Sequence, residues 1–246
     1  RGYYFDQALI EDFAEGVPND ESLDSIKRRF RSEIKQRLED KLAQTWGLGL
    51  AQQLNLKLQQ LAFDADYVID IHNGPVSTRH IYVPEYAKAS ASLFNIPNVI
   101  LIPNDFAGAL DEATFCQWWT LTELLSQKRG QALDFGVEAF TLEMGSQEVI
   151  SFEEGQYDAL SVLSYLSAKG CLANDVFEPK KMQRMAVTLE NYKILYTKQG
   201  GIVEYLVKPG EMVAKNQPIA TVLNVDDLEN EKATEQILAP CDLIPI

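Results

Sequence analysis

Cysteine and histidine are scarce in this chain. Its 246 residues include three cysteines, Cys116, Cys171 and Cys241, and two histidines, His72 and His80. The cysteines are widely spaced and odd in number, which excludes a disulfide framework and a Cys-x-x-Cys zinc motif. We therefore expect a reducing, cytoplasmic location. Two histidines are also too few for a His-rich metal site within one segment.

Positive charge and long apolar runs are scarce as well. Only 22 Lys and Arg oppose 36 Asp and Glu, so the formal net charge is -14. So acidic a surface repels phosphate backbones and anionic lipid. No apolar run approaches the ~20 residues that span a bilayer, and no basic-then-apolar signal pattern is present. We expect neither nucleic acid nor a membrane as a partner.

The apolar content is high enough for a folded core. It reaches 46%, with 10% aromatic residues, and the length allows a main domain with a small satellite. A long amphipathic helix is predicted from Asp20 onward, because apolar residues recur every three or four positions at Leu23, Ile26, Phe30, Ile34, Leu38 and Leu42. Trp118 and Trp119 lie in a later helical stripe and are interpreted as core.

A helix followed by a short apolar strand occurs three times. The helices are predicted at 50–63, 84–93 and 110–127, and the strands at 67–71, 98–102 and 139–144. This order is typical of an α/β domain with a helix-covered, mainly parallel sheet. We expect the first strand to be buried on both faces. One more covering helix is predicted at 157–169.

The pattern changes after Pro179. Short alternating runs, such as Ile202–Val207, are interrupted by Pro209-Gly210 and Gln217-Pro218. This alternation predicts a small C-terminal all-β domain. The predicted boundaries are 1–180 for the α/β domain and 181–246 for the β domain.

Reactive side chains follow two of the predicted strands. His72 lies at the end of the strand that contains Asp70, and neutral imidazole is a common zinc ligand that an adjoining carboxylate can orient. Ligands bind outside the carboxyl ends of the strands in open parallel sheets. The alternative is that His72 is a hydrogen-bonded structural residue.

Glu143 ends another apolar strand and precedes Gly145. Partial desolvation there would suit it to general-base catalysis, whereas the alternative is a Glu that caps a helix or pairs with an Arg. Arg79, placed in the loop after His72, is a candidate to bind a substrate carboxylate through its planar guanidinium; the alternative is an ordinary surface Arg.

An ordered set of motifs resembles a known family. The set comprises Asp70-Ile71-His72-Asn73-Gly74, then Leu142-Glu143-Met144-Gly145, then a β unit with Gly200-Gly201-Ile202-Val203, Lys208-Pro209-Gly210-Glu211-Met212-Val213 and Gln217-Pro218-Ile219-Ala220. In this order, from about Asp64 to the end, they resemble the succinylglutamate desuccinylase and aspartoacylase family of zinc-dependent amidohydrolases. The resemblance implies a zinc carboxypeptidase-like fold.

The resemblance also implies site residues and a reaction. His72 matches the third zinc ligand of the family, and Glu143 matches the general base. The implied activity is zinc-dependent hydrolysis of the amide bond in an N-acyl amino acid. The β unit is similar to a biotinyl or lipoyl carrier domain, but the expected turn, Asn224–Leu228, has no Lys, and Lys232 comes too late to be modified at its tip.

The sequence departs from the family at two places. The His-Gly-x-Glu motif that supplies the other two zinc ligands is absent, and Asp12-Phe13-Ala14-Glu15 is the nearest stretch to the Asp-x-Asn-Arg segment but lacks the Arg. Because the chain begins at Arg1 and not Met, we expect those ligands to lie upstream. The alternatives are a catalytically inactive binding protein and a carrier-like module of the same fold. The oligomeric state stays open, a homo-oligomer included.

Overall fold

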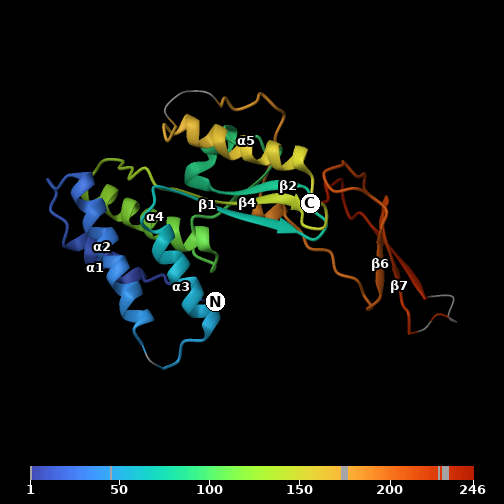
Figure 1. Ribbon diagram of the computed structural model, residues 1–246, viewed down its shortest axis with the longest axis horizontal. Helices are drawn as coiled ribbons and strands as arrows, with labels where there is room; N and C mark the ends of the chain where they lie inside the picture. Colours follow the sequence, from blue (N-terminus) through green and yellow to red (C-terminus); the bar gives the residue numbers. More distant parts are fainter. Residues whose placement is uncertain (1, 45, 173–176, 227, 229–232) are drawn as a thin grey trace. The chain divides into compact units, whose positions relative to one another are not determined.

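The computed structural model describes residues 2–44, 46–172, 177–226, 228 and 233–246 (Figure 1). The chain divides into two compact units. Unit 1 comprises residues 1–70, 83–88 and 102–141, and unit 2 comprises residues 71–82, 89–101 and 142–246. Strands of one five-stranded sheet, in the order β1-β4-β2-β3-β5, contribute to both units.

The five-stranded sheet is mostly parallel, as predicted. Its strands are β1 (Tyr67–Gly74), β2 (Arg79–Pro84), β3 (Asn98–Ile102), β4 (Glu138–Ser146) and β5 (Met185–Thr188). β3 and β5 are parallel, with Asn98 opposite Met185. The four-residue connection 75–78 is too short for a parallel crossover, so β2 runs opposite to β1.

Three features of this sheet differ from the sequence prediction. The strand β2 was not expected, although its Ile-Tyr-Val run consists of residues that favour strands. The expected burial of β1 on both faces is wrong, because β1 is an edge strand in which only Val68 is buried and Ile71 is 56% exposed. β5 lies beyond the predicted boundary near Lys180, yet it pairs with β3 in this sheet.

Unit 1 contains four helices around one apolar core. They are α1 (Gln7–Glu15), α2 (Leu23–Leu42), α3 (Leu50–Ala62) and α4 (Leu110–Arg129), drawn from blue to green in Figure 1. The stripe predicted for α2 is confirmed, since Ile26, Phe30, Ile34 and Leu38 are fully buried. The helix begins after Ser22, whose hydroxyl accepts a hydrogen bond from the Ser25 amide, and not at Asp20.

Aromatic side chains form the centre of this core. Trp118 stacks on Phe63 at a ring distance of 5.3 Å and meets Phe30 edge-on at 5.0 Å. Such pairs contribute about 0.5–1.5 kcal/mol each beyond the area they bury. The prediction that Trp118 is core is confirmed, whereas Trp119 is only half-buried.

Unit 2 contains α5 (Phe152–Ala168), which confirms the helix predicted at 157–169 and extends it toward its start. Tyr165 of α5 stacks on Phe94 at 4.4 Å, and the Ser161 hydroxyl accepts a hydrogen bond from the Asn95 amide at 2.9 Å. The 3-10 helices Glu85–Leu93 and Leu189–Asn191 complete the regular elements outside the strands.

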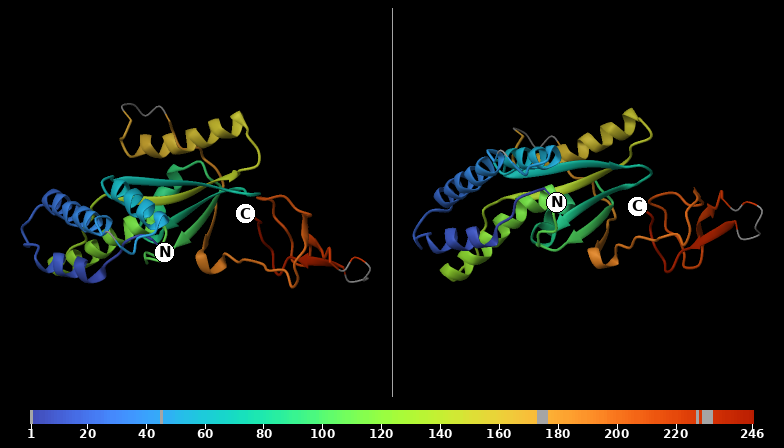
Figure 2. Two further views of the ribbon diagram at one scale, coloured as in Figure 1. Left: turned by 60° about the horizontal axis from the view of Figure 1, so that its bottom comes forward. Right: turned by 90° about the horizontal axis from the view of Figure 1, so that it is seen from below.

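A separate three-stranded antiparallel sheet confirms the small C-terminal all-β element (Figure 2). It consists of β6 (Ile202–Tyr205), β7 (Pro218–Leu223) and β8 (Thr234–Leu238), with Ile202 opposite Leu223 in the first pair. The turn considered for carrier chemistry includes Asp227, which, like Lys232, lies outside the described residues. The likeness of this antiparallel sheet to a carrier domain stays a prediction.

Candidate functional site

His72 lies within β1 and not after it, because the strand continues to Gly74. Side chains alternate between the two faces of a strand, so His72 shares its face with Val68 and Asp70. Its side chain is exposed, whereas Val68 is buried. The imidazole is therefore accessible from solvent, as a ligand-binding residue must be.

Hydrogen bonds at the two ends of the β1–β4 pair define its register. The Glu138 amide donates to the Asp66 carbonyl at 2.9 Å, which in a parallel ladder places Glu138 opposite Tyr67. Counted from this end of the pair, Glu143 lies opposite His72 and on the same face. Asp111 interacts with both Thr141 and Asp70, which supports this register as far as the preceding pair on that face. At the far end the Gln147 amide donates to the Gly74 carbonyl. This bond is shifted by one residue from the first register, so β4 has one residue more than β1 between the two hydrogen bonds. The extra residue lies between Glu138 and Gln147, in the stretch that contains Gly145, whose φ is 90°.

Glu143 is a half-buried residue whose carboxylate has an unsatisfied oxygen. Its Oε2 is shielded from solvent and has no hydrogen-bond partner within the described part of the chain. An unpaired buried oxygen of this kind costs about 1–3 kcal/mol or more when charged. Such a cost is typical of a group that acts on a ligand. Among the described residues, Glu143 neither caps a helix nor pairs with an Arg.

His80 is a buried histidine that the sequence reasoning did not select. It lies on β2, is 5% exposed, and its Nδ1 is 2.9 Å from the Thr78 carbonyl oxygen. Because a carbonyl only accepts, Nδ1 carries the proton and donates. Burial lowers the pKa of His80, and the Thr78 hydrogen bond and the Glu143 charge oppose that shift. His80 is a neutral neighbour of Glu143, and the Ile-Tyr-Val run that follows it was the signal for the strand that buries it.

Arg79 begins β2 and does not lie in a loop. Its guanidinium forms an ion pair with Asp158 of α5, lies 3.8 Å from a Glu154 carboxylate oxygen, and sits over the Tyr157 ring at 5.0 Å. Arg79 thus binds α5 to the sheet within unit 2. Binding of a substrate carboxylate by Arg79 stays a prediction, and such a ligand would have to replace Asp158.

The connection between β1 and β2 is held by hydrogen bonds to the end of β4. Ser146 donates through its hydroxyl to the Pro75 carbonyl at 2.6 Å. Gly74 is required at the start of this connection, because a Cβ atom there would lie 2.8 Å from the Ser77 Cβ. The tight approach sets the path from His72 to Arg79.

We expect Gly74→Ala to destabilise the protein by about 1–3 kcal/mol, because two Cβ atoms cannot approach so closely without a backbone shift. Thermal unfolding measures the loss. The control is Gly74→Ala combined with Ser77→Gly, which removes the opposing atom. If the double variant were as unstable as Gly74→Ala alone, the close contact would not be the cause.

Unit 1 contains a buried carboxylate at the start of α4. Asp111 is 1% exposed and accepts a hydrogen bond from the Glu112 amide at 2.9 Å. The pKa of Asp111 is raised to about 6, mainly by burial and also by the charges of Glu112 and Asp70, while hydrogen bonds from the Glu112 amide and the Thr141 hydroxyl oppose the shift. Asp111 therefore titrates close to neutral pH. No pattern in the sequence selected Asp111.

The described residues do not complete a zinc site. Within them there is no group of three or more His, Cys, Asp or Glu side chains placed to hold a metal ion. His72 is a suitable nitrogen donor, but three protein ligands are usual for catalytic zinc.

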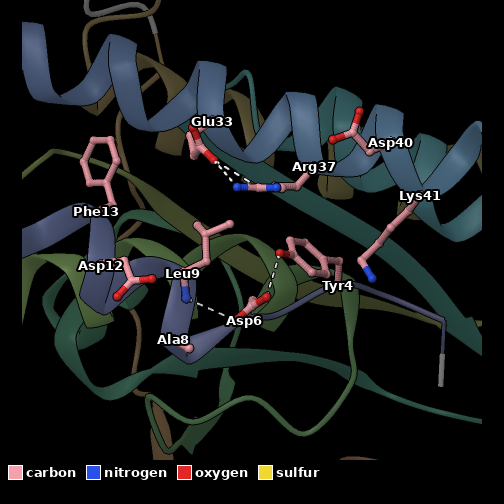
Figure 3. Close-up of a pocket in the computed structure, with 10 residues that line it drawn as sticks. All are labelled: Tyr4, Asp6, Ala8, Leu9, Asp12, Phe13, Glu33, Arg37, Asp40 and Lys41. Atoms are coloured by element: carbon pink, nitrogen blue, oxygen red, sulfur yellow. Dashed lines mark hydrogen bonds and ion pairs between the residues drawn. The ribbon is translucent and has the colours of Figure 1, made fainter.

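A cavity in unit 1 contains none of the predicted site residues (Figure 3). It measures about 630 Å³ and lies between the first residues with α1 and the helix α2. Its polar groups pair with one another: Arg37 with Glu33, and the Tyr4 hydroxyl with Asp6. Asp12, from the stretch compared with the Asp-x-Asn-Arg segment, lies on its wall without a neighbouring predicted ligand.

Comparison with known proteins identifies relatives of the whole chain. The catalytic-domain model of the succinylglutamate desuccinylase/aspartoacylase family matches residues 20–168. The crystal structure of a succinylglutamate desuccinylase/aspartoacylase from Shewanella frigidimarina NCIMB 400 is 34% identical in sequence, with a TM-score of 0.92. The match covers 100% of this chain and 65% of that one. A family protein from Shewanella amazonensis SB2B is 35% identical, with a TM-score of 0.88 and coverages of 100% and 67%.

A more distant match shows a likeness of fold alone. The apo structure of the ectoine utilization protein EutE (DoeB) from Ruegeria pomeroyi is 18% identical, with a TM-score of 0.57 over 80% of this chain and 59% of that one. No curated protein matches the chain. The chain spans about two thirds of the length of the two Shewanella proteins.

The chain thus has an α/β domain with a mostly parallel five-stranded sheet, together with a separate three-stranded antiparallel sheet. Helices long and apolar enough to cross a membrane are absent from the described part of the chain. The chain belongs to the succinylglutamate desuccinylase/aspartoacylase family.

Proposed function

We propose that this protein takes part in zinc-dependent hydrolysis of an amide bond, removing the acyl group from an N-acyl amino acid. Membership of a family named for desuccinylases and aspartoacylases supports this activity. The observation that carries the proposal is the register of β1 and β4, which sets His72 beside Glu143 on one face of the sheet. A nitrogen donor next to a carboxylate with an unsatisfied oxygen suits metal-assisted hydrolysis.

Glu143 has the central role in the proposed reaction. Its carboxylate accepts a proton from the attacking water as the water oxygen bonds to the amide carbon. The same carboxyl group then returns the proton to the amide nitrogen as the carbon–nitrogen bond breaks.

His72 would supply one ligand to zinc, and the described residues contain no group of three side chains that would complete the site. When bound, the ion would supply Lewis-acid polarisation of the scissile carbonyl. Asp70, two positions before His72, would orient the imidazole. A cytoplasmic location, a small-molecule substrate and a substrate carboxylate bound by Arg79 belong to the same proposal.

We expect Asp70→Asn to lower zinc affinity by about 10- to 100-fold, the effect typical for loss of a carboxylate that supports a ligand. His72→Ala removes the ligand itself and should lower zinc affinity by more than this. Elemental analysis of a zinc-binding preparation measures it. His80→Gln, which changes the other histidine of the chain, should retain the metal.

Zinc content that is unchanged in His72→Ala would contradict the ligand assignment. A protein that binds an N-acyl amino acid with neither zinc nor turnover would instead support the inactive binding protein considered from the sequence.

A further inference from the structure

The helix α3 presents a leucine stripe to solvent, made of Leu50, Leu54, Leu58 and Leu61. All four leucines are exposed, and Leu50 and Leu61 are so to 83% and 74%. At 3.6 residues per turn, the four side chains lie within an arc of about 80° around the helix axis. An apolar stripe of this kind normally faces a core or another helix. The leucine stripe is therefore a helix face of unit 1 that the described part of the chain leaves uncovered.

The opposite side of α3 is held against unit 1 by a buried amide. Gln59 accepts a hydrogen bond from the Tyr4 amide at 2.7 Å and donates to the carbonyls of Tyr4 at 2.6 Å and of Ala113 at 3.2 Å. Leu56, which is also buried, lies on the same side of the helix. Turning α3 to bury the leucine stripe would break these hydrogen bonds and leave Gln59 unsatisfied. The leucines are therefore fixed toward solvent.

The charge on α3 favours a second copy of this chain as the partner. The chain has a formal net charge of -14, so most faces of two copies repel each other. In contrast, α3 contains no Asp or Glu, and its one charged residue is Lys57. A lysine can keep its ammonium in water while its stem covers apolar surface. Two α3 helices can thus approach without bringing carboxylates of these helices together.

The leucine spacing suits a symmetric pair of helices. In a two-fold symmetric contact, residue i of one copy faces residue j of the other, and j faces i. If the helices are antiparallel and the axis lies near Leu56, Leu50 faces Leu61 of the second copy. Leu54 then faces Leu58 in the same way. Every residue of the leucine stripe therefore meets another leucine.

We propose that this chain forms a homodimer in which the leucine stripes of two antiparallel α3 helices pack against each other. The contact is one helix of 13 residues from each copy, about 20 Å long at 1.5 Å per residue. Stable interfaces bury about 1,200–2,000 Å² in total, which is more than a single short helix pair provides. The dimer is therefore in reversible equilibrium with the monomer.

Sedimentation velocity at about 1–200 µM protein tests the proposal, since small interfaces are weak. We expect monomer at the lowest concentrations and dimer at the highest. Leu54→Glu should weaken association by at least about 10-fold, because it places a charge in the apolar contact twice. Leu238→Glu makes the same change at an exposed leucine of β8 and should associate as the parent does. Both leucines are exposed, so neither variant should lower the melting temperature appreciably.

Disulfide formation between copies tests the antiparallel arrangement. The background carries Cys171→Ser and Cys241→Ser, which remove the two exposed cysteines. A mixture of Leu50→Cys and Leu61→Cys chains should form a mixed dimer, because these positions face each other. Leu50→Cys alone should not cross-link, since the two copies of position 50 lie about 17 Å apart along the helices, beyond the reach of a disulfide.

Three results would overturn the proposal. The first is a chain that stays monomeric over the whole concentration range, as it would if another polypeptide covered the leucine stripe. The second is a Leu54→Glu variant that associates as the parent does. The third is cross-linking of Leu50→Cys alone that is as fast as cross-linking of the mixture.

Discussion

Replacing Glu143 by Gln is expected to reduce hydrolysis of an N-acyl amino acid by about 10²- to 10⁴-fold. Gln has the size of Glu and keeps a hydrogen-bonding group at the same place, but it cannot accept the proton of the attacking water. Oε2 of Glu143 has no hydrogen-bond partner in the described part of the chain, so replacing this oxygen by the amide nitrogen of Gln breaks no hydrogen bond there. The melting temperature should therefore change little, and bound zinc should stay.

The measurement pairs turnover with thermal unfolding on one preparation that hydrolyses an N-acyl amino acid, such as N-succinylglutamate. Glu148→Gln is the matched control, since Glu148 is exposed and lies just beyond β4. A structural Glu143 would give the opposite pattern, with lost stability and preserved activity per folded molecule. That result would remove Glu143 from the proposed reaction.

Asp111 is expected to make the free energy of unfolding fall as the pH rises from about 4 to about 6. Its pKa is about 6 in the folded protein, against an ordinary value of 3.8. Between these values the unfolded chain loses the proton while the folded protein retains it, so ionisation favours the unfolded state. At about 1.4 kcal/mol per pKa unit, the difference reaches up to about 3 kcal/mol and is then constant above pH 6.

We expect Asp111→Asn to be more stable than the parent at pH 7–8 by about 1–3 kcal/mol, and equal to it near pH 4. Asn cannot ionise, yet its oxygen can still accept from the Glu112 amide. Part of the gain is offset, by about 0.3–1 kcal/mol, because a negative charge favours the start of α4.

Denaturant unfolding at a series of pH values measures this difference. Asp20→Asn removes one charge at an exposed position and controls for net charge. A difference between Asp111→Asn and the parent that is independent of pH would show that Asp111 ionisation is not its cause.

Local patterns in the sequence determined most of the elements of this fold. The stripe from Leu23 to Leu42 specified α2, and the apolar run 98–102 specified β3 with the same bounds that the structure has. Both depend on interactions between near neighbours in the chain, which helical and strand periodicity express directly. The family motifs around His72 and Glu143 were local as well.

Long-range packing decided the rest, because burial and pairing depend on segments far apart in the chain. Only the sheet order made β1 an edge strand, which left Ile71 exposed where the apolar sequence predicted burial. Only the packing of α5 gave Arg79 its partner Asp158. The raised pKa of Asp111 likewise requires its burial beside Thr141 and Asp70, which no spacing along the chain expresses. The register that sets His72 beside Glu143 is the same kind of information, since it arises from hydrogen bonds between strands some seventy residues apart.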